Sequence, residues 1–226
     1  MKKAEQLSAA FAYGCRRTGE LGIDEELREF ASTGQGRKRI CIYLKQLEPY
    51  FYYQLIARAN GMKDIFSQRI IKAYWIGNEL LEKITPKHVQ QALGQAEFKL
   101  KVKNNFLLTG GKAHHNYTVL AAVPIKSVQF LELVNNCVIS WGKVEKIEDG
   151  RLLVSTQLIN LKNQKWVLGN WQKREINKGL IKNVRIGDWL AIHFGEARYK
   201  LSQADYRQLK KYTQSALTFF NLSRVF

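Results

Sequence analysis

The chain has 226 residues and a formal net charge of +17 at pH 7. Hydrophobic residues make up 46% of it and aromatic residues 12%, which excludes a disordered protein and is typical of a globular one. The excess of Lys and Arg favours an anionic partner or surface, and it suits equally well a basic protein whose charge only keeps it soluble.

The first hundred residues show helical periodicity. Between residues 64 and 83 the apolar side chains recur about every four positions, which predicts one continuous helix. Pro49 suits the first turn of another helix, and Asp24 suits the N-cap position. The helices expected here cover residues 5–13, a segment capped by Asp24, 47–60, 64–83 and 85–100.

The pattern changes after residue 106. Thr109–Gly111 predicts a loop, 117–123 a short extended run, and 127–135 a linking helix. From residue 138 to 193 apolar and polar residues alternate with a period of about two, which indicates β-strands. The expected turns lie at Asp149-Gly150, Asn163-Gln164 and Gly169-Asn170, and a C-terminal helix follows Ser202.

These patterns predict an α+β protein: a helical N-terminal domain, then a small OB-like β-barrel and a C-terminal helix. We place the helical domain at residues 1–105, a connector with glycines and histidines at 106–134, and the barrel with its helix at 135–226. No apolar run reaches the ~18–20 residues needed to cross a bilayer. Three widely spaced cysteines and the lack of a signal-peptide pattern favour a reduced, cytoplasmic protein.

Two motifs in the second half combine a thiol with an imidazole. Cys137–Val144 enters the first expected strand with the sequence Cys-Val-Ile-Ser-Trp-Gly-Lys-Val. Gly187–Ala197 contains Gly187-Asp188-Trp189 and His193-Phe194-Gly195. Placed together in a small barrel, Cys137 and His193 would suit a soft or borderline transition metal.

Residues 135–212 resemble the HypC/HybG family of nickel-iron hydrogenase maturation chaperones. In that family a Cys stands at the same distance from Gly-Lys-Val, and a Gly-x-Trp segment followed by His-x-Gly-x-Ala closes the barrel. The resemblance implies a HypC-like barrel and a non-catalytic accessory protein that carries or presents iron through Cys137. It implies as partner the hydrogenase large subunit precursor or a HypD-like scaffold.

Two departures from the family pattern bear on the metal. Trp141 replaces the family Pro, and Cys137 is internal, so its nitrogen is an amide and not a free amine. His114 or His115 would then replace the missing amine ligand, since a thiolate with two imidazoles is a plausible iron or zinc set. Adjacent residues of an extended segment point to opposite faces, so only one of these histidines should reach the site. A thiolate beside an imidazole would also make Cys137 the fastest-reacting cysteine.

Each of these side chains also has a purely structural interpretation. Cys137 suits a small buried hydrophobe, His193 a core histidine bonded to a carbonyl, and the His114-His115 pair a polar loop. The first half has a further, fainter resemblance, to an uncharacterised bacterial family with a Trp-x-Gly-Asn-x-Leu-Leu segment and a His-His-x-aromatic segment. Here these are Trp75–Leu81 and His114–Tyr117.

A second functional hypothesis uses the charge. Basic and aromatic residues alternate in the expected barrel, and such residues on a small barrel can stack bases and neutralise phosphates. A basic hairpin with core tryptophans explains the same pattern without nucleic acid. The candidate nucleic-acid-binding residues are Lys162, Lys165, Trp166, Trp171, Lys173 and Arg174.

Overall fold

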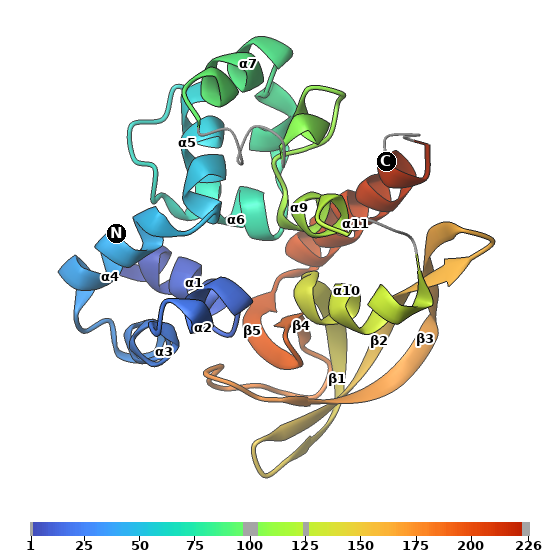
Figure 1. Ribbon diagram of the computed structural model, residues 1–226. Coiled ribbons are helices and arrows are strands. Elements are labelled where there is room, and N and C mark those ends of the chain that lie inside the picture. The colour runs from blue at the N-terminus through green and yellow to red at the C-terminus, as the bar shows by residue number, and fades with distance from the viewer. Residues whose placement is uncertain (1, 97–103, 124–126, 223–226) are drawn as a thin grey trace.

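The computed structural model describes residues 2–96, 104–123 and 127–222. Helices occupy the first half, a closed five-stranded β-barrel follows, and a long helix comes last among the described residues, as expected for the α+β class (Figure 1). The helices are α1 Lys2–Ala12, α2 Arg16–Glu20, α3 Asp24–Thr33, α4 Arg37–Gln46, α5 Pro49–Ala59, α6 Gln68–Trp75, η1 Glu79–Lys83, α7 Pro86–Gly94, η2 Asn105–Leu107, α9 His115–Ala121, η3 Val128–Phe130, α10 Leu131–Cys137 and α11 Gln203–Leu222. The strands are β1 Ser140–Glu148, β2 Arg151–Lys162, β3 Lys165–Asn177, β4 Trp189–His193 and β5 Glu196–Leu201.

The single helix predicted over residues 64–83 is wrong. Helix α6 ends at Trp75, and the chain turns at Gly77, whose φ is +95°. A Cβ at this glycine would lie 2.0 Å from the ring of Tyr212, so the turn also brings α11 into close contact. The apolar periodicity continues across the break because η1 buries Leu80 and Leu81 in the same core.

Three other helices predicted in the first half are present, and one predicted cap is not. Helices α1 and α5 confirm the predictions over 5–13 and 47–60, with Pro49 in the first turn of α5. Thr85 caps α7, which ends at Gly94, and residues 97–100 of that prediction lie outside the described residues. Asp24 is the first residue of α3 and not its cap, and its carboxylate accepts a hydrogen bond from the Gly14 N–H at 2.9 Å.

The connector is more helical than expected. Residues 117–123 were predicted to be extended, but helix α9 covers most of them. The reason is local: the side chain of His114 accepts the Asn116 N–H and so caps the helix. The linking helix predicted over 127–135 is confirmed by η3 and α10. Cys137 therefore ends a helix and does not begin a strand.

The barrel has the strand order β1-β2-β3-β5-β4, and β4 pairs with β1 to close it. All neighbours are antiparallel except β3 and β5, which meet at one parallel pair. Asn163 and Gln164 form the β2–β3 turn in the left-handed region, as predicted, and Gly150 turns β1 into β2. The turn predicted at Gly169-Asn170 is wrong, because β3 runs through these residues, which form a bulge opposite Leu158 of β2.

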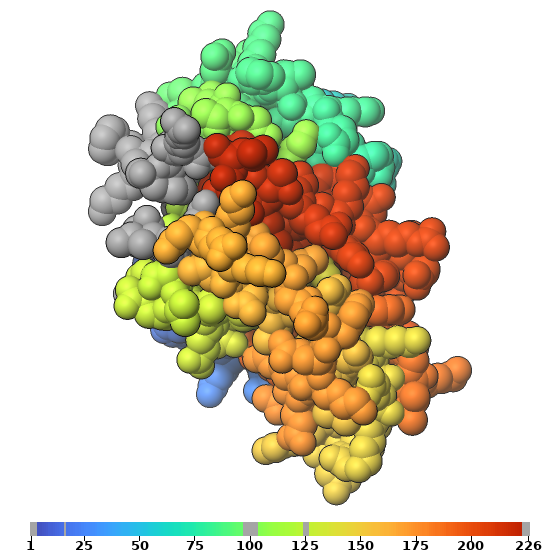
Figure 2. Space-filling view, turned by 90° about the vertical axis from the view of Figure 1, so that its right-hand side faces the viewer, coloured from blue at the N-terminus to red at the C-terminus, as the bar shows by residue number. Residues whose placement is uncertain are grey.

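One hydrophobic cluster joins the two halves of the molecule. It contains Phe11 and Trp75 from the helices, Trp141 and Ala191 from the barrel, and Leu209 from α11. Helix α11 contacts α9, β1, β3 and β5, and it runs between the helical part and the barrel (Figure 2). The barrel interior forms a separate cluster. The domain boundaries proposed above remain predictions. Among the described residues, none of the helices has both the length and the apolar character to span a bilayer.

Three asparagine side chains join helices to strands in the same way. The buried Asn116 of α9 accepts the Ile139 N–H at 2.8 Å and donates to the Ile139 carbonyl at 2.9 Å. Asn135 of α10 makes the same pair of bonds with Ile159, and Asn221 of α11 makes it with Trp166. Each side-chain amide thus forms hydrogen bonds with one backbone N–H and one backbone carbonyl that the strands do not pair with each other.

We expect Asn116→Ala to lower the free energy of unfolding by about 2–4 kcal/mol, because it leaves the Ile139 N–H and carbonyl buried without partners. Urea unfolding at pH 7 measures this change. Asn170→Ala, at an exposed asparagine of β3, is the matched control and should change the free energy by less than about 0.5 kcal/mol. A similar small effect of both substitutions would contradict the role assigned to Asn116.

Candidate functional site

A cleft of about 470 Å³ lies where the helical half meets the barrel. Its floor is buried and aromatic, with Tyr74 and Trp75 from α6, and its rim includes the exposed Leu133 of α10. The side chains that carry its chemistry come from five different segments and are Cys15, Glu48, His115, Cys137 and His193. The structure thus brings three of the four predicted metal-ligand candidates to one place.

Cys137 is half-buried at the end of α10. Burial raises the pKa of its thiol. A raised pKa disfavours the thiolate, which is the opposite of the shift expected from the sequence. That Cys137 is the fastest-reacting cysteine stays a prediction. Its carbonyl accepts a hydrogen bond from His115 Nε2 at 2.9 Å, which holds the end of α10 against the start of α9.

His115 uses both of its ring nitrogens within the protein. Because a carbonyl only accepts, the bond to Cys137 O places the proton on Nε2. The lone pair of Nδ1 then accepts from the Tyr74 hydroxyl at 3.2 Å. The ring also packs on Trp75, with centroids 4.5 Å apart. In this arrangement His115 has no lone pair left for a metal and acts as a structural member of the cleft.

His193 differs from His115 in having a nitrogen to spare. Its Nδ1 donates to the carbonyl of Phe11 at 2.9 Å, so Nε2 carries a lone pair, and Nε2 makes no hydrogen bond with any described residue. Burial, with smaller effects from His115 and Arg198, holds the pKa of His193 well below its usual range. The imidazole is thus neutral, which is the form that binds metals.

His114 lies outside the cleft although it is the neighbour of His115. It caps α9, and its fully buried ring stacks on Tyr212 with centroids 5.5 Å apart. Burial, and next the adjacent His115, lower its pKa to about 3. The expectation that only one of the two histidines reaches the site agrees with this placement, although the cause is a helix start and not an extended segment.

Cys15 is a residue of the cleft that sequence reasoning missed. It occupies the N-cap position of α2 and lines the same cavity as Cys137. Burial is the main cause that raises the pKa of Cys15 to about 12; Arg198 opposes the shift and Cys137 adds to it. An isolated cysteine beside a glycine turn carries no sequence signal. All three cysteines are free thiols, and Cys41, on α4, does not line the cleft.

The described residues provide an incomplete metal site. No group of three or more His, Cys, Asp or Glu side chains among them is arranged to hold a metal ion. What the cleft offers is the Cys137 thiol and the Nε2 lone pair of His193, a soft and a borderline donor. A metal held here would need further ligands from another molecule.

The residues of the nucleic-acid hypothesis lie along the β2–β3 hairpin. Trp166 is buried and its backbone is bound by Asn221 of α11, so it belongs to the core. Trp171 is 45% exposed, and its ring lies 6.0 Å from that of Trp189, which stacks on Tyr206. The basic residues of the same hairpin are Lys162, Lys165, Lys173 and Arg174. Lys173 pairs with Glu145 at 3.1 Å.

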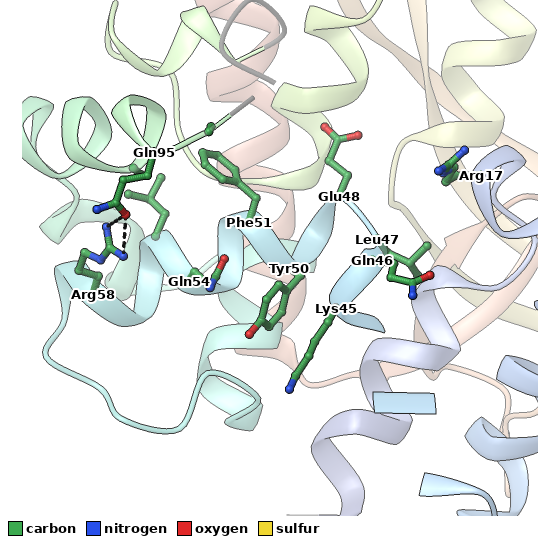
Figure 3. Close-up of a pocket in the computed structure, with 13 residues that line it drawn as sticks. Arg17, Lys45, Gln46, Leu47, Glu48, Tyr50, Phe51, Gln54, Arg58 and Gln95 are labelled. Atoms are coloured by element: carbon green, nitrogen blue, oxygen red, sulfur yellow. Dashed lines mark hydrogen bonds between the residues drawn. The ribbon is translucent and has the colours of Figure 1, made fainter. Parts of the chain in front are cut away.

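A second hollow of about 850 Å³ adjoins the cleft and runs along α5. The two hollows share Arg17, Leu47 and Glu48 in their walls. Figure 3 shows Arg58 and Arg17 at opposite ends of this groove, with Lys45 and Tyr50 between them. We call this hollow the α5 groove. No motif in the sequence pointed to it, because its residues come from α2, the α4–α5 corner, α5 and α7.

The comparisons with known proteins identify a family and no activity. Residues 2–225 match the model of a family of unknown function, DUF6390. The chain belongs to this family. None of the curated proteins and none of the solved structures gives a match. The family agrees with the fainter resemblance, to an uncharacterised family, and it gives no link to HypC/HybG, so that resemblance stays a prediction.

We expect the buried histidines to make the protein less stable in mild acid. The unfolded chain binds a proton at each imidazole with a pKa near ~6.5, whereas folded His114 does so only near 3. Below pH 6.5 the unfolded state therefore takes up more protons, and the free energy of unfolding falls as the pH drops toward 3. Since Asn also caps helices but does not titrate, His114→Asn should reduce this loss by about 2 kcal/mol between pH 7 and pH 5.

Urea unfolding at the two pH values measures the difference. Ser67→Asn, which exchanges the non-titrating cap of α6, is the matched control and should keep the wild-type pH dependence. An unchanged pH dependence in His114→Asn would show that this imidazole does not stay neutral in the folded protein.

Proposed function

We propose that this protein is a non-catalytic accessory protein of metalloenzyme maturation that presents iron from the cleft between its two halves. The observation that supports this most strongly is the convergence of Cys137 and His193 in one cavity. The OB-like barrel followed by a C-terminal helix agrees with the HypC-like architecture that first suggested the role. A reduced, cytoplasmic setting belongs to the proposal, in keeping with three free thiols.

The donor set suits transfer better than storage. A thiol and one imidazole nitrogen hold a metal weakly, and the remaining positions are open to ligands from a partner. We take the partner to be the precursor of a nickel-iron hydrogenase large subunit or a HypD-like scaffold, as the HypC/HybG resemblance implies. Iron is cargo in this proposal, and the protein carries out no turnover of its own.

Metal binding would change the protonation of the cleft. The thiol of Cys137 is protonated in the free protein, since burial raises its pKa, and it must lose this proton to bind iron. Iron uptake should therefore release protons and improve as the pH rises toward 8. His193 is already neutral, so it adds no proton release of its own.

We expect the protein, purified without oxygen and mixed with ferrous iron and the large subunit precursor, to retain iron that Cys137→Ala loses. Iron bound to the complex after gel filtration is the measurement. Cys41→Ala is the matched control, because Cys41 lies on α4 away from the cleft, and it should retain iron as the wild type does. Equal iron in the wild type and Cys137→Ala would contradict the presenting role.

A second candidate function is the binding of single-stranded nucleic acid. The specific observation in its favour is the exposed Trp171 next to the stacked rings of Trp189 and Tyr206, on the same face of β3 as Lys173. Such a surface can stack a base and neutralise the neighbouring phosphate.

If this function holds, a labelled single-stranded oligonucleotide should bind at low salt and dissociate steeply as salt rises, because phosphate contacts release counterions. Trp171→Ala should weaken binding about fivefold or more through the loss of stacking. Fluorescence anisotropy measures both effects, with Tyr43→Ala on α4 as the control. Absence of binding at low salt would eliminate this candidate.

A further inference from the structure

The cleft and the α5 groove form one connected depression with two kinds of surface. The cleft end, toward α10, is apolar and has the aromatic floor described above. The α5 groove, which continues toward α7, is more polar than the cleft and is lined by three glutamine side chains, Gln46, Gln54 and Gln95. The depression therefore extends from α10 to α7 along the helical half, and its character changes from apolar to polar along the way.

The charges along this depression are mostly positive. Arg17, Lys45 and Arg58 are exposed in its walls, and among the described lining residues Glu48 is the single carboxylate that accompanies them. Among the described residues, the partner to which Arg58 donates is the neutral Gln95, at 3.4 and 3.5 Å. Arg17 has Glu20 at 3.5 Å, an exposed contact that contributes little. These cations are thus available to carboxylates from outside.

The polar end has groups that suit a peptide backbone. The amide of a glutamine both donates and accepts hydrogen bonds, as the backbone of an extended peptide requires. Tyr50 and Phe51 are half-buried between the glutamines and give the groove an aromatic wall (Figure 3).

We propose that this depression binds an acidic, extended peptide segment of a partner protein. One apolar side chain of the segment enters the cleft beside Leu133, and its carboxylates lie near Arg17, Lys45 and Arg58. Interfaces commonly combine a buried apolar anchor residue with charged residues around it. The anchor supplies most of the affinity, and the charges guide the orientation of the bound segment. This inference does not depend on iron, on Cys137 or on the identity of the partner.

The test is selection of displayed random peptides on the immobilised full-length chain, followed by anisotropy titrations with the enriched sequences. We expect enrichment of Asp and Glu next to an aromatic or aliphatic residue. Arg17→Glu combined with Arg58→Glu should weaken binding at least about tenfold, which corresponds to about 1.4 kcal/mol. Leu133→Glu should weaken it comparably, because it places a charge at the mouth of the apolar cleft.

Matched controls separate these effects from general changes in charge and hydrophobicity. Arg151→Glu with Lys182→Glu makes the same charge change on exposed barrel residues, and Ile186→Glu replaces an exposed apolar residue outside the depression. Both should bind as the wild type does. The titrations contain no iron, which keeps this test independent of the iron proposal.

The proposal is overturned if no peptide is enriched, if the enriched peptides lack acidic residues, or if the arginine variants bind as tightly as the controls. A single-stranded oligonucleotide that binds at Arg17 and Arg58 more tightly than every selected peptide would also overturn it, in favour of nucleic acid. Circular dichroism of each variant verifies that lost binding does not reflect lost folding.

Discussion

The rest of the structure depends on how the barrel caps the C-terminal end of α1. The last carbonyls of a helix have no partner within the helix. Here the carbonyl of Phe11 accepts from His193, and the buried Arg198 donates to the carbonyl of Ala10 at 3.4 Å. The Arg198 guanidinium also lies 3.6 Å from the centre of the Tyr13 ring, whose hydroxyl donates to Glu196. Side chains of β4 and β5 thus complete a helix almost two hundred residues away in the sequence.

This junction explains why the cleft exists where it does. With α1 held on β4 and β5, the α1–α2 corner brings Cys15 to one wall, and the bond from His115 to the end of α10 brings Cys137 to another. The aromatic packing of Trp75 against His115 and His193 fills the space between them. The neutral imidazole of His193 and the protonated thiols of Cys15 and Cys137 cost less free energy here than their charged forms would, so these three side chains rest uncharged.

The two proposals concern different parts of one depression. The thiol and imidazole lie at its deep apolar end, whereas the cations and glutamines lie along α5. A partner peptide seated along α5 would bring its protein next to Cys137, and a partner that supplies metal ligands would then meet a donor set that is incomplete on its own. Effective concentration links the two events, because docking at one end raises the local concentration of ligands at the other.

The sequence alone determined the order of the elements: helices first, then period-two strands with the Asn163-Gln164 turn, then a terminal helix. These features rest on local patterns, since apolar spacing and turn residues act within a few positions. Only the tertiary structure decided the break at Gly77, which depends on contact with Tyr212. It also decided the different roles of the histidines. His193 donates to the carbonyl of Phe11 and His115 to that of Cys137, and these bonds decide which ring nitrogen keeps its lone pair. No local sequence pattern predicts which distant backbone groups a side chain contacts.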